Sequence, residues 1–494
     1  MNERGLPVDT PLVKSVIKYI EQYNAKLVEE FIELTGGVTP TQVQQLKLWF
    51  EDQGLKLDSL ERVGVERILK TDIPDNIRRV LEIRLELGRV STKKLYTILR
   101  LDSGDGRVRG SFIYHGAGPG RWTAQRLQPH NFQRPTIKNV DRVIDLLEKE
   151  DYDTLETEFP DNVMEAIGSA MRGFIKAPDG QLIVRADYSA IEARVLAWLA
   201  GEKELVLAFH EGKDIYVDMA GTIFGEDPAV ILEGHKANIL KYSDMRKLGK
   251  DTILGCGYQM FVSTFLCQAE RKGSDDVGGI PIRLDEAMIG QRDEETFNSE
   301  AWDLAYTAVT SYRTKYKRIV NLWKDCENAV IAAINNPGCR YRVQKKITFQ
   351  FKDGTLRMWL PSGRPICYPE ARLEQTTWYN GRTKTSIKFK AVSDKGIWRW
   401  EYLYGGKIVE NAVQGIARDI MAYGMWNAAK RKFANIGTVH DEIIALYKRL
   451  RGKVTLARRF ERIICSLPEW AIGPTKAETI PLTAEGVVSL RYGK

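Results

Sequence analysis

The sequence predicts an α+β protein, and two observations lead to this fold class. Apolar residues recur with helical spacing through residues 1–110 and through most of 201–340, whereas strand-like patterns appear in 111–200 and return from 341 onward. The 494 residues are enough for about three domain-sized units with a large core. We therefore expect two mainly helical regions and two segments that contribute strands.

The individual elements are expected in the following chain order. Residues 11–34 (PLVKSVIKYIEQYNAKLVEEFIEL) and 76–88 (NIRRVLEIRLELG) have helical periodicity, and so has the long segment 305–334. Between these helical segments, residues 270–300 are polar and contain glycine, which predicts an exposed excursion. Residues 341–368 contain a series of strand patterns.

One helical segment carries chemically informative residues on a single face. Arg246, Lys250, Leu254 and Tyr258 recur every four residues, so on a helix they form one stripe, roughly 18 Å long at 1.5 Å per residue. Two cations, an apolar middle and an aromatic ring follow the order of phosphates, sugar and base in a nucleoside triphosphate. A helix N-terminus also attracts anions. The alternative is an ordinary amphipathic helix with solvated cations.

Two aspartates stand where strands are expected to end. Gln181–Ala186 (QLIVRA) predicts a buried strand, which is followed by Asp187 and then by a segment with helical spacing. In IGTVHDEIIALY, two short strands are expected to turn at His440, Asp441 and Glu442. A rigid sheet fixes such carboxylates, which makes both aspartates candidates for binding a metal ion. Either aspartate alone could instead be a turn former or a helix cap.

At these residues the sequence resembles the family A DNA polymerases of the bacteriophage or prophage type. DYSAIEAR, RKLGKDTILGCGY and VHDE resemble motifs A, B and C of that family, and their order and wide spacing also fit. Gly118–Pro135 (GPGRWTAQRLQPHNFQRP) resembles the template- and primer-binding segment. Tyr404–Ile420 (YGGKIVENAVQGIARDI) resembles the glutamine-containing helix that lies against the primer–template. The resemblance extends over nearly all of the chain.

The resemblance implies a right-hand polymerase fold, with a palm built on an antiparallel sheet and with helical fingers and thumb. On this basis we expect the thumb in residues 1–110, the first palm segment in 111–200, the fingers in 201–340 and the second palm segment in 341–494. The implied activity is the addition of dNTPs to a primer 3′ end on a DNA template, with release of pyrophosphate.

The resemblance also implies two Mg²⁺ ions at the site, with Mn²⁺ as a substitute. Mg²⁺ prefers oxygen ligands and commonly takes one or two protein carboxylates together with substrate phosphates. Two such ions neutralise charge and position the reactants in phosphoryl transfer. The implied metal ligands are Asp187, Asp441 and the backbone carbonyl of Tyr188, with Glu442 in a secondary role. Lys250 is expected to bind the phosphates and to donate a proton to pyrophosphate.

The incoming dNTP is expected to contact the Arg246–Tyr258 stripe and two further side chains. Tyr216 occupies a position that is often held by a phosphate-contacting histidine, so its hydroxyl can donate a hydrogen bond but carries no positive charge. Glu192, five residues after Asp187, is expected to collide with a 2′-hydroxyl. Family A DNA polymerases have glutamate there, whereas the related single-subunit RNA polymerases have a smaller residue.

Contacts with the primer–template are expected from several segments of the chain. Lys and Arg number 73 against 65 Asp and Glu, and the net charge of +8 suits a polyanionic partner. Lys93 and Lys94 could equally be the solvated end of a helix. The residues expected to contact DNA are Arg121, Gln133, Gln414, His440, Lys93 and Lys94.

Other features limit the classes of function. The six cysteines are scattered without a zinc-ligand spacing, which argues against a zinc site and for a reducing compartment. The N-terminus is polar and no apolar run approaches 18 residues, so neither a signal peptide nor a membrane span is expected. We expect a monomer in the cytoplasm, which is that of a bacterial host if the gene belongs to a phage.

No paired D-x-E element precedes the polymerase segments, so we expect no proofreading exonuclease in this chain and regard a separate exonuclease or processivity protein as a candidate partner. Two alternative functions stay open. One is a catalytically silent DNA-binding scaffold of the replisome, which the intact Asp187, Asp441 and Lys250 oppose. The other is a single-subunit RNA polymerase, which Glu192 opposes.

Overall fold

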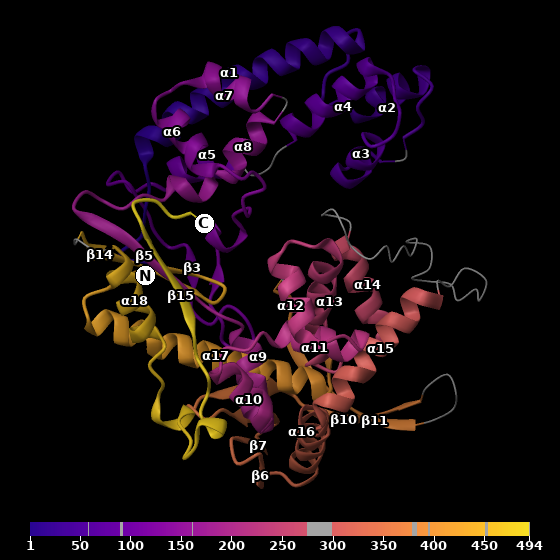
Figure 1. Ribbon diagram of the computed structural model, residues 1–494, viewed down its shortest axis with the longest axis vertical. Helices are drawn as coiled ribbons and strands as arrows, with labels where there is room; N and C mark the ends of the chain where they lie inside the picture. The colour runs from indigo at the N-terminus through magenta and orange to yellow at the C-terminus, as the bar shows by residue number, and fades with distance from the viewer. Residues whose placement is uncertain are drawn as a thin grey trace.

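The structure is a computed structural model that describes residues 1–57, 59–88, 92–160, 162–273, 299–377, 383–393, 396–449 and 453–493. Helices and antiparallel sheets build it, which confirms the predicted α+β class. Figure 1 shows a helical lobe at the top, a sheet with covering helices at the lower left and a second helical region at the lower right. Most of the excursion expected at 270–300 lies outside the described residues.

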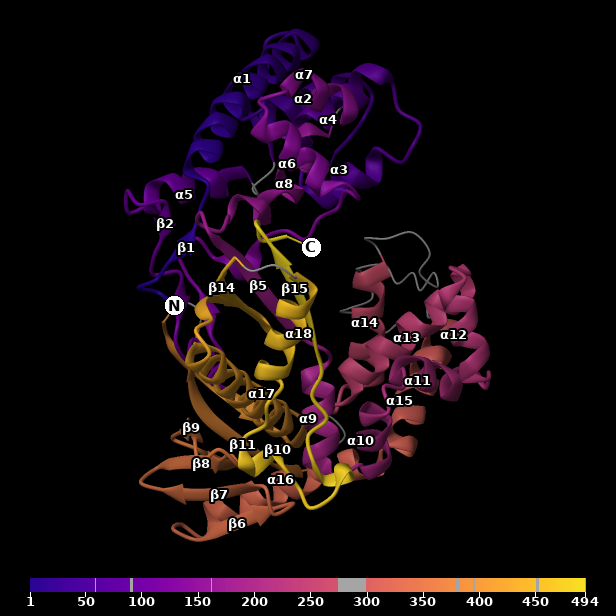
Figure 2. The ribbon, with the colours of Figure 1, turned by 60° about the vertical axis from the view of Figure 1, so that its left-hand side comes forward.

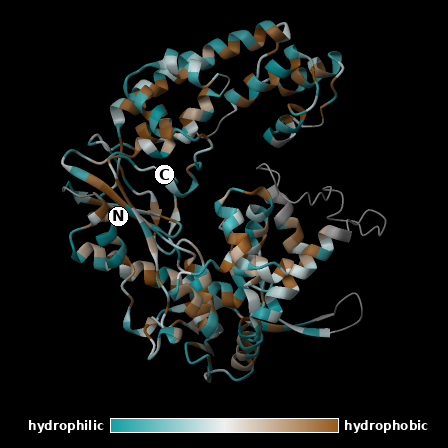
Figure 3. Ribbon diagram, in the orientation of Figure 1, coloured by the Kyte–Doolittle hydropathy of each residue, from teal (hydrophilic) through white to brown (hydrophobic). Residues whose placement is uncertain are grey.

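The helical lobe at the top of Figure 1 packs around its own hydrophobic core. Its longest helix, α1, is capped by Asp9, whose side chain accepts a hydrogen bond from the amide of Leu12. Hydrophobic and hydrophilic residues alternate along α1 (Figure 3), which is typical of a helix with one buried face. The helices of the lobe are α1 (Thr10–Thr35), α2 (Val43–Asp52), α3 (Arg62–Ile68), α4 (Asp75–Leu87), α5 (Lys93–Leu101), α6 (Val140–Glu148), α7 (Tyr152–Glu158) and α8 (Val163–Ser169).

This lobe extends beyond the expected thumb segment. α6 packs against α1, and α8 packs against α4, so residues well past 110 share the core of the N-terminal helices. Two short antiparallel pairs adjoin this lobe: β1 (Leu6–Pro7), which precedes α1, pairs with β2 (Arg107–Val108), and β3 (Phe112–Ile113) pairs with β4 (Thr123–Ala124). The segment expected as the first part of the palm is therefore divided between this lobe and the central sheet.

The central sheet is antiparallel and has the strand order β13–β14–β5–β15. Leu182, Val184 and Ala186 of β5 belong to the core shared with the covering helices, whereas Ile183 belongs to the core of the upper lobe. Burial on both faces explains why QLIVRA is nearly continuous in apolar residues. The strands are β5 (Gln181–Tyr188), β13 (Ala434–Val439), β14 (Glu442–Lys448) and β15 (Ala484–Ser489).

Helices α17 and α18 pack on this sheet, and α9 packs on α17. Figure 2 shows α17 and α18 beside the strands, and α17 packs against both α9 and α18. The helices are α9 (Ile191–Ala200), α17 (Gly405–Lys430) and α18 (Lys453–Ile464). Because the sheet is held between two cores, the ends of its strands are fixed relative to both.

The second helical region contains the helix that carries the stripe. That helix, α13, packs closely on α11. Gly249 permits this close approach, since a Cβ at this position would lie 2.1 Å from the carbonyl oxygen of Tyr216. It ends at Cys256, so Tyr258 follows the helix instead of belonging to it. The helices of this region are α10 (Lys203–His210), α11 (Ile215–Phe224), α12 (Pro228–Lys236), α13 (Leu240–Cys256), α14 (Val262–Gly273), α15 (Ser299–Lys315) and α16 (Lys317–Asn335).

Two further antiparallel sheets lie next to α16. One confirms the strand patterns of 341–368 and consists of β6 (Arg340–Val343), β7 (Ile347–Lys352), β8 (Thr355–Trp359) and β9 (Pro365–Pro369). The other was not expected and consists of β10 (Arg372–Thr377), β11 (Thr383–Val392) and β12 (Trp398–Leu403). Among the helices that the structure describes, none has both the length and the apolar character that crossing a bilayer requires.

Candidate active site

Asp187 lies at the end of β5, and Asp441 lies in the turn that leads into the neighbouring strand β14. In the pairing of β5 with β14, Asp187 lies opposite Glu442. The amide of Tyr188 donates a hydrogen bond to the carbonyl of Asp441 over 3.1 Å. Asp441 occupies the turn of the β13–β14 hairpin, whose flanking pair is Val439 and Glu442. The two aspartates therefore lie next to each other in the sheet, at the same end of the neighbouring strands β5 and β14.

A residue in the left-handed region stands beside each aspartate. Ala190, directly ahead of α9, has φ 49°, and His440 has φ 52°. Residues with a Cβ avoid this region, and such strained positions concentrate at functional sites where the surrounding fold imposes them. The chain thus turns sharply next to both carboxylates.

Asp441 lies in surroundings that disfavour its negative charge. Burial raises its pKa to about 6 against the lowering effect of Arg121, and the charges of Glu192 and Asp187 add to the increase. A divalent cation would relieve this repulsion. Among the described residues, no three His, Cys, Asp or Glu side chains gather as a ready cation site. The carboxylates of Asp187 and Asp441 suit Mg²⁺ by their chemistry, because this ion takes few protein carboxylates and completes its shell with other oxygens.

Arg121 connects Asp441 to the rest of the predicted site. Its guanidinium donates to Oε1 of Glu192 over 2.6 Å and to Oδ1 of Asp441 over 3.3 Å. The other oxygen of Glu192 accepts a hydrogen bond from the hydroxyl of Tyr258 over 3.3 Å. The sequence predicted all four residues as parts of the site, and the structure joins them in one chain of contacts.

Several residues expected to contact DNA line one cavity with Asp441. This cavity, called the Arg121 cavity below, has a volume of about 320 Å³ and is lined by Arg121, Gln414 and His440. The ring of His440 lies 5.7 Å from that of His130, a lining residue that the sequence analysis missed. Burial lowers the pKa of both histidines, so the neutral rings are favoured near Arg121.

A second cavity, called the Arg246 cavity, has a volume of about 510 Å³ and lies beside Asp187. Tyr216 and Arg246 also line it, as the sequence predicted for contacts with phosphates. The Nε of Arg246 donates to Oδ2 of Asp214 over 2.8 Å, and its guanidinium lies 5.4 Å from the centre of the Tyr216 ring. The cations that line this cavity are Arg194, Lys213 and Arg246.

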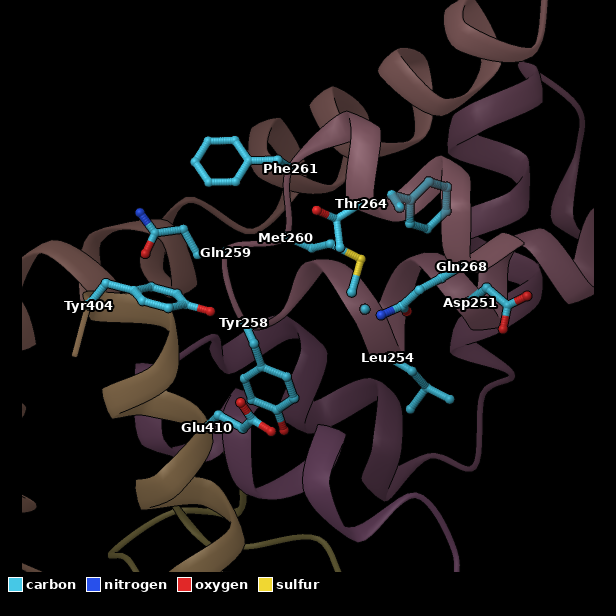
Figure 4. Close-up of a pocket in the computed structure, with 12 residues that line it drawn as sticks. Asp251, Leu254, Tyr258, Gln259, Met260, Phe261, Thr264, Gln268, Tyr404 and Glu410 are labelled. Carbon is cyan, nitrogen blue, oxygen red and sulfur yellow. The ribbon is translucent and has the colours of Figure 1, made fainter. Parts of the chain in front are cut away.

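The stripe is divided between two cavities. Leu254 and Tyr258 line a third cavity of about 440 Å³, the Tyr258 cavity, which lies between α13, α14 and the start of α17 (Figure 4). Burial raises the pKa of Tyr258 well above its ordinary value, and Glu192 adds to the increase, so the phenol stays protonated and able to donate. Lys250 is exposed on α13.

Glu442 is engaged on both of its carboxylate oxygens. It is 4% exposed, and it accepts hydrogen bonds from Nη1 of Arg185 over 2.6 Å and from the hydroxyl of Tyr492 over 2.7 Å. Neither partner was predicted from the sequence, and no local signal indicates them, because they lie 257 and 50 residues away from Glu442. This geometry favours a role in fixing the hairpin that carries Asp441.

Three residues expected to contact DNA lie away from the cavities. The Nζ of Lys94 donates to the carbonyl of Leu127 over 3.0 Å, and burial lowers its pKa. Lys93 is exposed at the start of α5, and Gln133 is half-buried. The described residues that line the three cavities do not include Lys93, Lys94 or Gln133.

Known proteins resemble this chain over its whole length. Residues 18–266 match the model for DNA polymerase family A. The chain is 31% identical to the DNA polymerase of Bacillus phage SP02 over 495 residues, which cover 100% of this chain and 69% of the phage protein. It is 26% identical to the thermostable DNA polymerase I of Thermus filiformis over 241 residues, 47% of this chain and 25% of that enzyme.

A solved structure has a similar fold. The polymerase domain of Pol1 from M. smegmatis, in a complex with DNA primer–template and dNTP, matches with a TM-score of 0.55 and 14% sequence identity. The match covers 99% of this chain and 67% of that chain. It confirms the right-hand fold that the motifs implied.

Proposed function

The chain belongs to DNA polymerase family A, and from this premise we propose that it adds dNTPs to the 3′ end of a primer on a DNA template, with release of pyrophosphate. The observation that carries the proposal is the meeting of Asp187 and Asp441 at neighbouring strand ends. One of these aspartates lines the Arg246 cavity, and the other lines the Arg121 cavity. A reaction centre between a nucleotide and a primer would have this arrangement.

Asp187, Asp441 and the backbone carbonyl of Tyr188 are the proposed ligands of the divalent ions on which this family generally depends. Two Mg²⁺ ions, or Mn²⁺ in their place, would supply charge neutralisation on the transferring phosphate and alignment of the attacking and leaving oxygens. The neighbouring strands hold both carboxylates in place before substrate arrives, which reduces reorganisation. The raised pKa of Asp441 supports a cation at this point.

The proposed position of the dNTP is along α13, with its triphosphate toward the Arg246 cavity. Arg246 is already oriented by Asp214, and a planar guanidinium has further donors for a phosphate. Tyr216, under the guanidinium, would donate its hydroxyl hydrogen. Lys250, exposed on the same helix, would bind the phosphates and supply the proton to pyrophosphate, and Leu254 would contact the apolar part of the nucleotide.

The proposed role of Glu192 is to exclude ribonucleotides. Its carboxylate accepts hydrogen bonds from Arg121 and from the hydroxyl of Tyr258. A carboxylate held by two partners moves aside for a 2′-hydroxyl only if these hydrogen bonds break. Tyr258 therefore contributes to the nucleotide site in two ways, as a ring beside the base and as a support for Glu192.

The primer–template is proposed to lie across the Arg121 cavity, where Arg121, Gln414 and His440 would contact it. We assign the lobe α1–α8 to the thumb, the β13–β14–β5–β15 sheet with its covering helices to the palm and α10–α16 to the fingers. Lys93, Lys94 and Gln133 would contact the DNA backbone farther from the reaction centre. A monomeric state and a separate exonuclease or processivity protein stay predictions.

Primer extension on a templated duplex with Mg²⁺ tests the proposal. Extension is expected with dNTPs and not with rNTPs. Binding of the duplex without any extension would favour the silent scaffold, and extension with rNTPs alone would favour the RNA polymerase.

Replacement of Glu192 sharpens the same test. Glu192→Ala removes the obstacle to the 2′-hydroxyl, so incorporation of rNTPs relative to dNTPs is expected to rise by about tenfold or more. Glu233→Ala, which changes an exposed glutamate on α12, is the matched control and is expected to leave the ratio unchanged. An unchanged ratio in Glu192→Ala would reject the role of Glu192.

A further inference from the structure

The sheet β10–β11–β12 has one buried face and one open face. On the buried face, Ile387 and Leu403 pair across β11 and β12 and belong to the core next to α16. On the open face, Lys388 pairs with Arg372 on one side and with Tyr402 on the other. In an antiparallel sheet, such paired residues point to the same side. The open face therefore presents cations and aromatic rings together.

A row of aromatic side chains runs along the edge strand β12. Trp398, Trp400 and Tyr402 alternate with other residues, and their exposed fractions are 58%, 37% and 51%. These three residues are called the aromatic face below. Tyr404 continues the alternation, because its backbone is still extended (φ −135°, ψ 166°) before α17 begins. At about 3.3 Å per residue the row is roughly 20 Å long. Exposed rings at this density indicate a binding surface.

Three cations lie over these rings. The guanidinium of Arg372 is 3.9 Å from the centre of the Trp400 ring, and the Nζ of Lys390 is 5.5 Å from the same ring. The Nζ of Lys388 is 5.0 Å from the centre of the Tyr402 ring. Lys388 also pairs with Glu374, and Lys390 pairs with Glu370. The two carboxylates are 41% and 58% exposed, and ion pairs near the surface are weak, so an incoming phosphate could replace the carboxylates.

The row leads to the Tyr258 cavity. Tyr404 lines the Tyr258 cavity together with Tyr258 and Glu410, and Figure 4 shows these three side chains around the same space. A strand of nucleic acid lying along β12 would therefore arrive next to the end of α13. Because Tyr258 is the proposed neighbour of the incoming base, a strand that arrives here would be the template.

We propose that the aromatic face binds the single-stranded part of the template before it reaches the Tyr258 cavity. The ligand is single-stranded DNA, because stacking on protein rings requires unpaired bases, while cations beside the rings bind the phosphates. A purely apolar partner would not require the three cations, and a duplex would offer no free base faces. The inference rests on the proposed polymerase function, since it assigns the strand to the template.

Binding measurements on two primer–templates test the proposal. One has a 5′ template overhang of about twelve nucleotides and the other has an overhang of a single nucleotide, and affinity is measured by fluorescence anisotropy. In the triple variant Trp398→Ala/Trp400→Ala/Tyr402→Ala, affinity for the long overhang is expected to fall by about tenfold or more. Affinity for the short overhang is expected to change by less than about twofold, because stacking is lost only with the longer strand.

Trp426→Ala is the matched control. Trp426 is also exposed (52%) and has a cation, Lys430, 3.2 Å from its ring centre. It lies near the far end of α17, roughly 33 Å from Tyr404 at 1.5 Å per residue. This variant is expected to bind both duplexes like the wild type.

Arg372→Gln provides a second measurement that leaves the rings in place. Removal of one phosphate contact is expected to reduce the slope of log affinity against log salt by about 0.7 for the long overhang. Equal losses for both overhangs, or no loss for either, in the triple variant would overturn the proposal and would favour a protein partner for this face. If the wild type does not extend a primer, the proposed function fails; if it does, only the assignment of the aromatic face is at stake.

Discussion

Asp441 and Glu442 are neighbours in the sequence, but the structure places them in opposite surroundings. On the open side of the hairpin, the Asp441 side chain is 32% exposed and shares Arg121 with Glu192. On the buried side, the Glu442 side chain is 5% exposed and lies between Arg185 and Tyr492. Two carboxylates of the same charge thus have different environments: Asp441 lines the Arg121 cavity, and Glu442 is buried between its two partners.

The different surroundings of Asp441 and Glu442 make it possible to distinguish a loss of primer extension from a loss of stability. An ionised carboxylate in the interior is tolerated only when its partners are in place, so removal of one partner is costly. A carboxylate at the edge of a cavity can lose its charge without a cost to folding. Substitutions on the open side should therefore affect extension first, and substitutions on the buried side should affect stability first.

The largest expected effect is on the open side. Asp441→Asn keeps the size of the side chain but removes a proposed metal ligand, so primer extension is expected to fall by about a thousandfold or more. Binding of primer–template should be nearly unchanged. Stability should not fall, because the raised pKa means that the folded state disfavours the ionised form. Extension assays and urea denaturation measure the two effects.

Asp187→Asn is expected to lose extension to a similar extent. Retained extension in either purified variant would reject the assignment of the metal ligands. A large loss of stability in Asp441→Asn would instead remove the distinction between the two sides of the hairpin.

The next largest effect is expected on the buried side. Arg185→Met leaves the buried charge of Glu442 without its cation, so the free energy of unfolding is expected to fall by about 3–5 kcal/mol. Urea denaturation at pH 7 measures it. Arg142→Met is the matched control, because its pair with Glu158 is exposed and its loss should cost much less.

A double variant identifies the cause. In Arg185→Met/Glu442→Leu both charges are gone, and most of the lost stability is expected to return. If the double variant is as unstable as Arg185→Met, the loss comes from the packing of Arg185 and not from an unpaired carboxylate.

Tyr492→Phe is expected to have a smaller effect. The variant keeps the buried ring and removes one hydrogen bond to an ionised group, which should lower the free energy of unfolding by about 1–3 kcal/mol. Arg185 stays paired with Glu442. A drop as large as that of Arg185→Met, measured by the same urea titration, would mean that the hydroxyl contributes as much as the guanidinium.

The smallest expected effect is at Asp9, a largely buried carboxylate that contacts the residue before Tyr492. Arg491 and Lys176 both donate to Asp9. Burial acts to raise the pKa of Asp9, but these hydrogen bonds and charges lower it overall from 3.8. Because the folded pKa is depressed, the contribution to stability is present above about pH 3.8 and is lost as the pH falls through the folded pKa.

Asp9→Asn tests this pH dependence. Asparagine still caps a helix, so the variant isolates the charge. At pH 7 the variant should be slightly less stable than the wild type in urea, and the difference should shrink as the pH falls below about 3.8. If the variant is still less stable than the wild type well below pH 3.8, the loss of stability comes from a weaker cap on α1 and not from the charge.

The sequence predicted the parts of the site that are encoded within single elements. The strand before Asp187, the hairpin around Asp441 and the stripe on α13 each follow from the period of one segment. The helix expected for the stripe is present, but it ends before Tyr258. α13 stops at Cys256, and Gln259 is left-handed with φ 66°, so Tyr258 follows the helix.

Contacts between distant elements could not be predicted in this way. The hydrogen bond from Arg121 to Asp441 joins residues 320 positions apart, and its existence depends on how the β3–β4 region packs on the sheet. The partner of Glu442 depends on the register of β5 against β14, which one strand pattern does not specify. In residues 398–404 (WRWEYLY), aromatic residues alternate with other residues. This pattern was the available signal for the β12 strand and its aromatic face.

The position of β5 between β14 and β15 has a consequence for the synthesis of the chain. β5 leaves the ribosome long before either partner, since Arg185 and its partner Glu442 are 257 residues apart. At about 5–20 residues per second, the strand waits on the order of tens of seconds without hydrogen-bonded neighbours. An unpaired hydrophobic strand of this kind is prone to associate with other chains. Chaperones that shield nascent chains should therefore raise the yield of this protein.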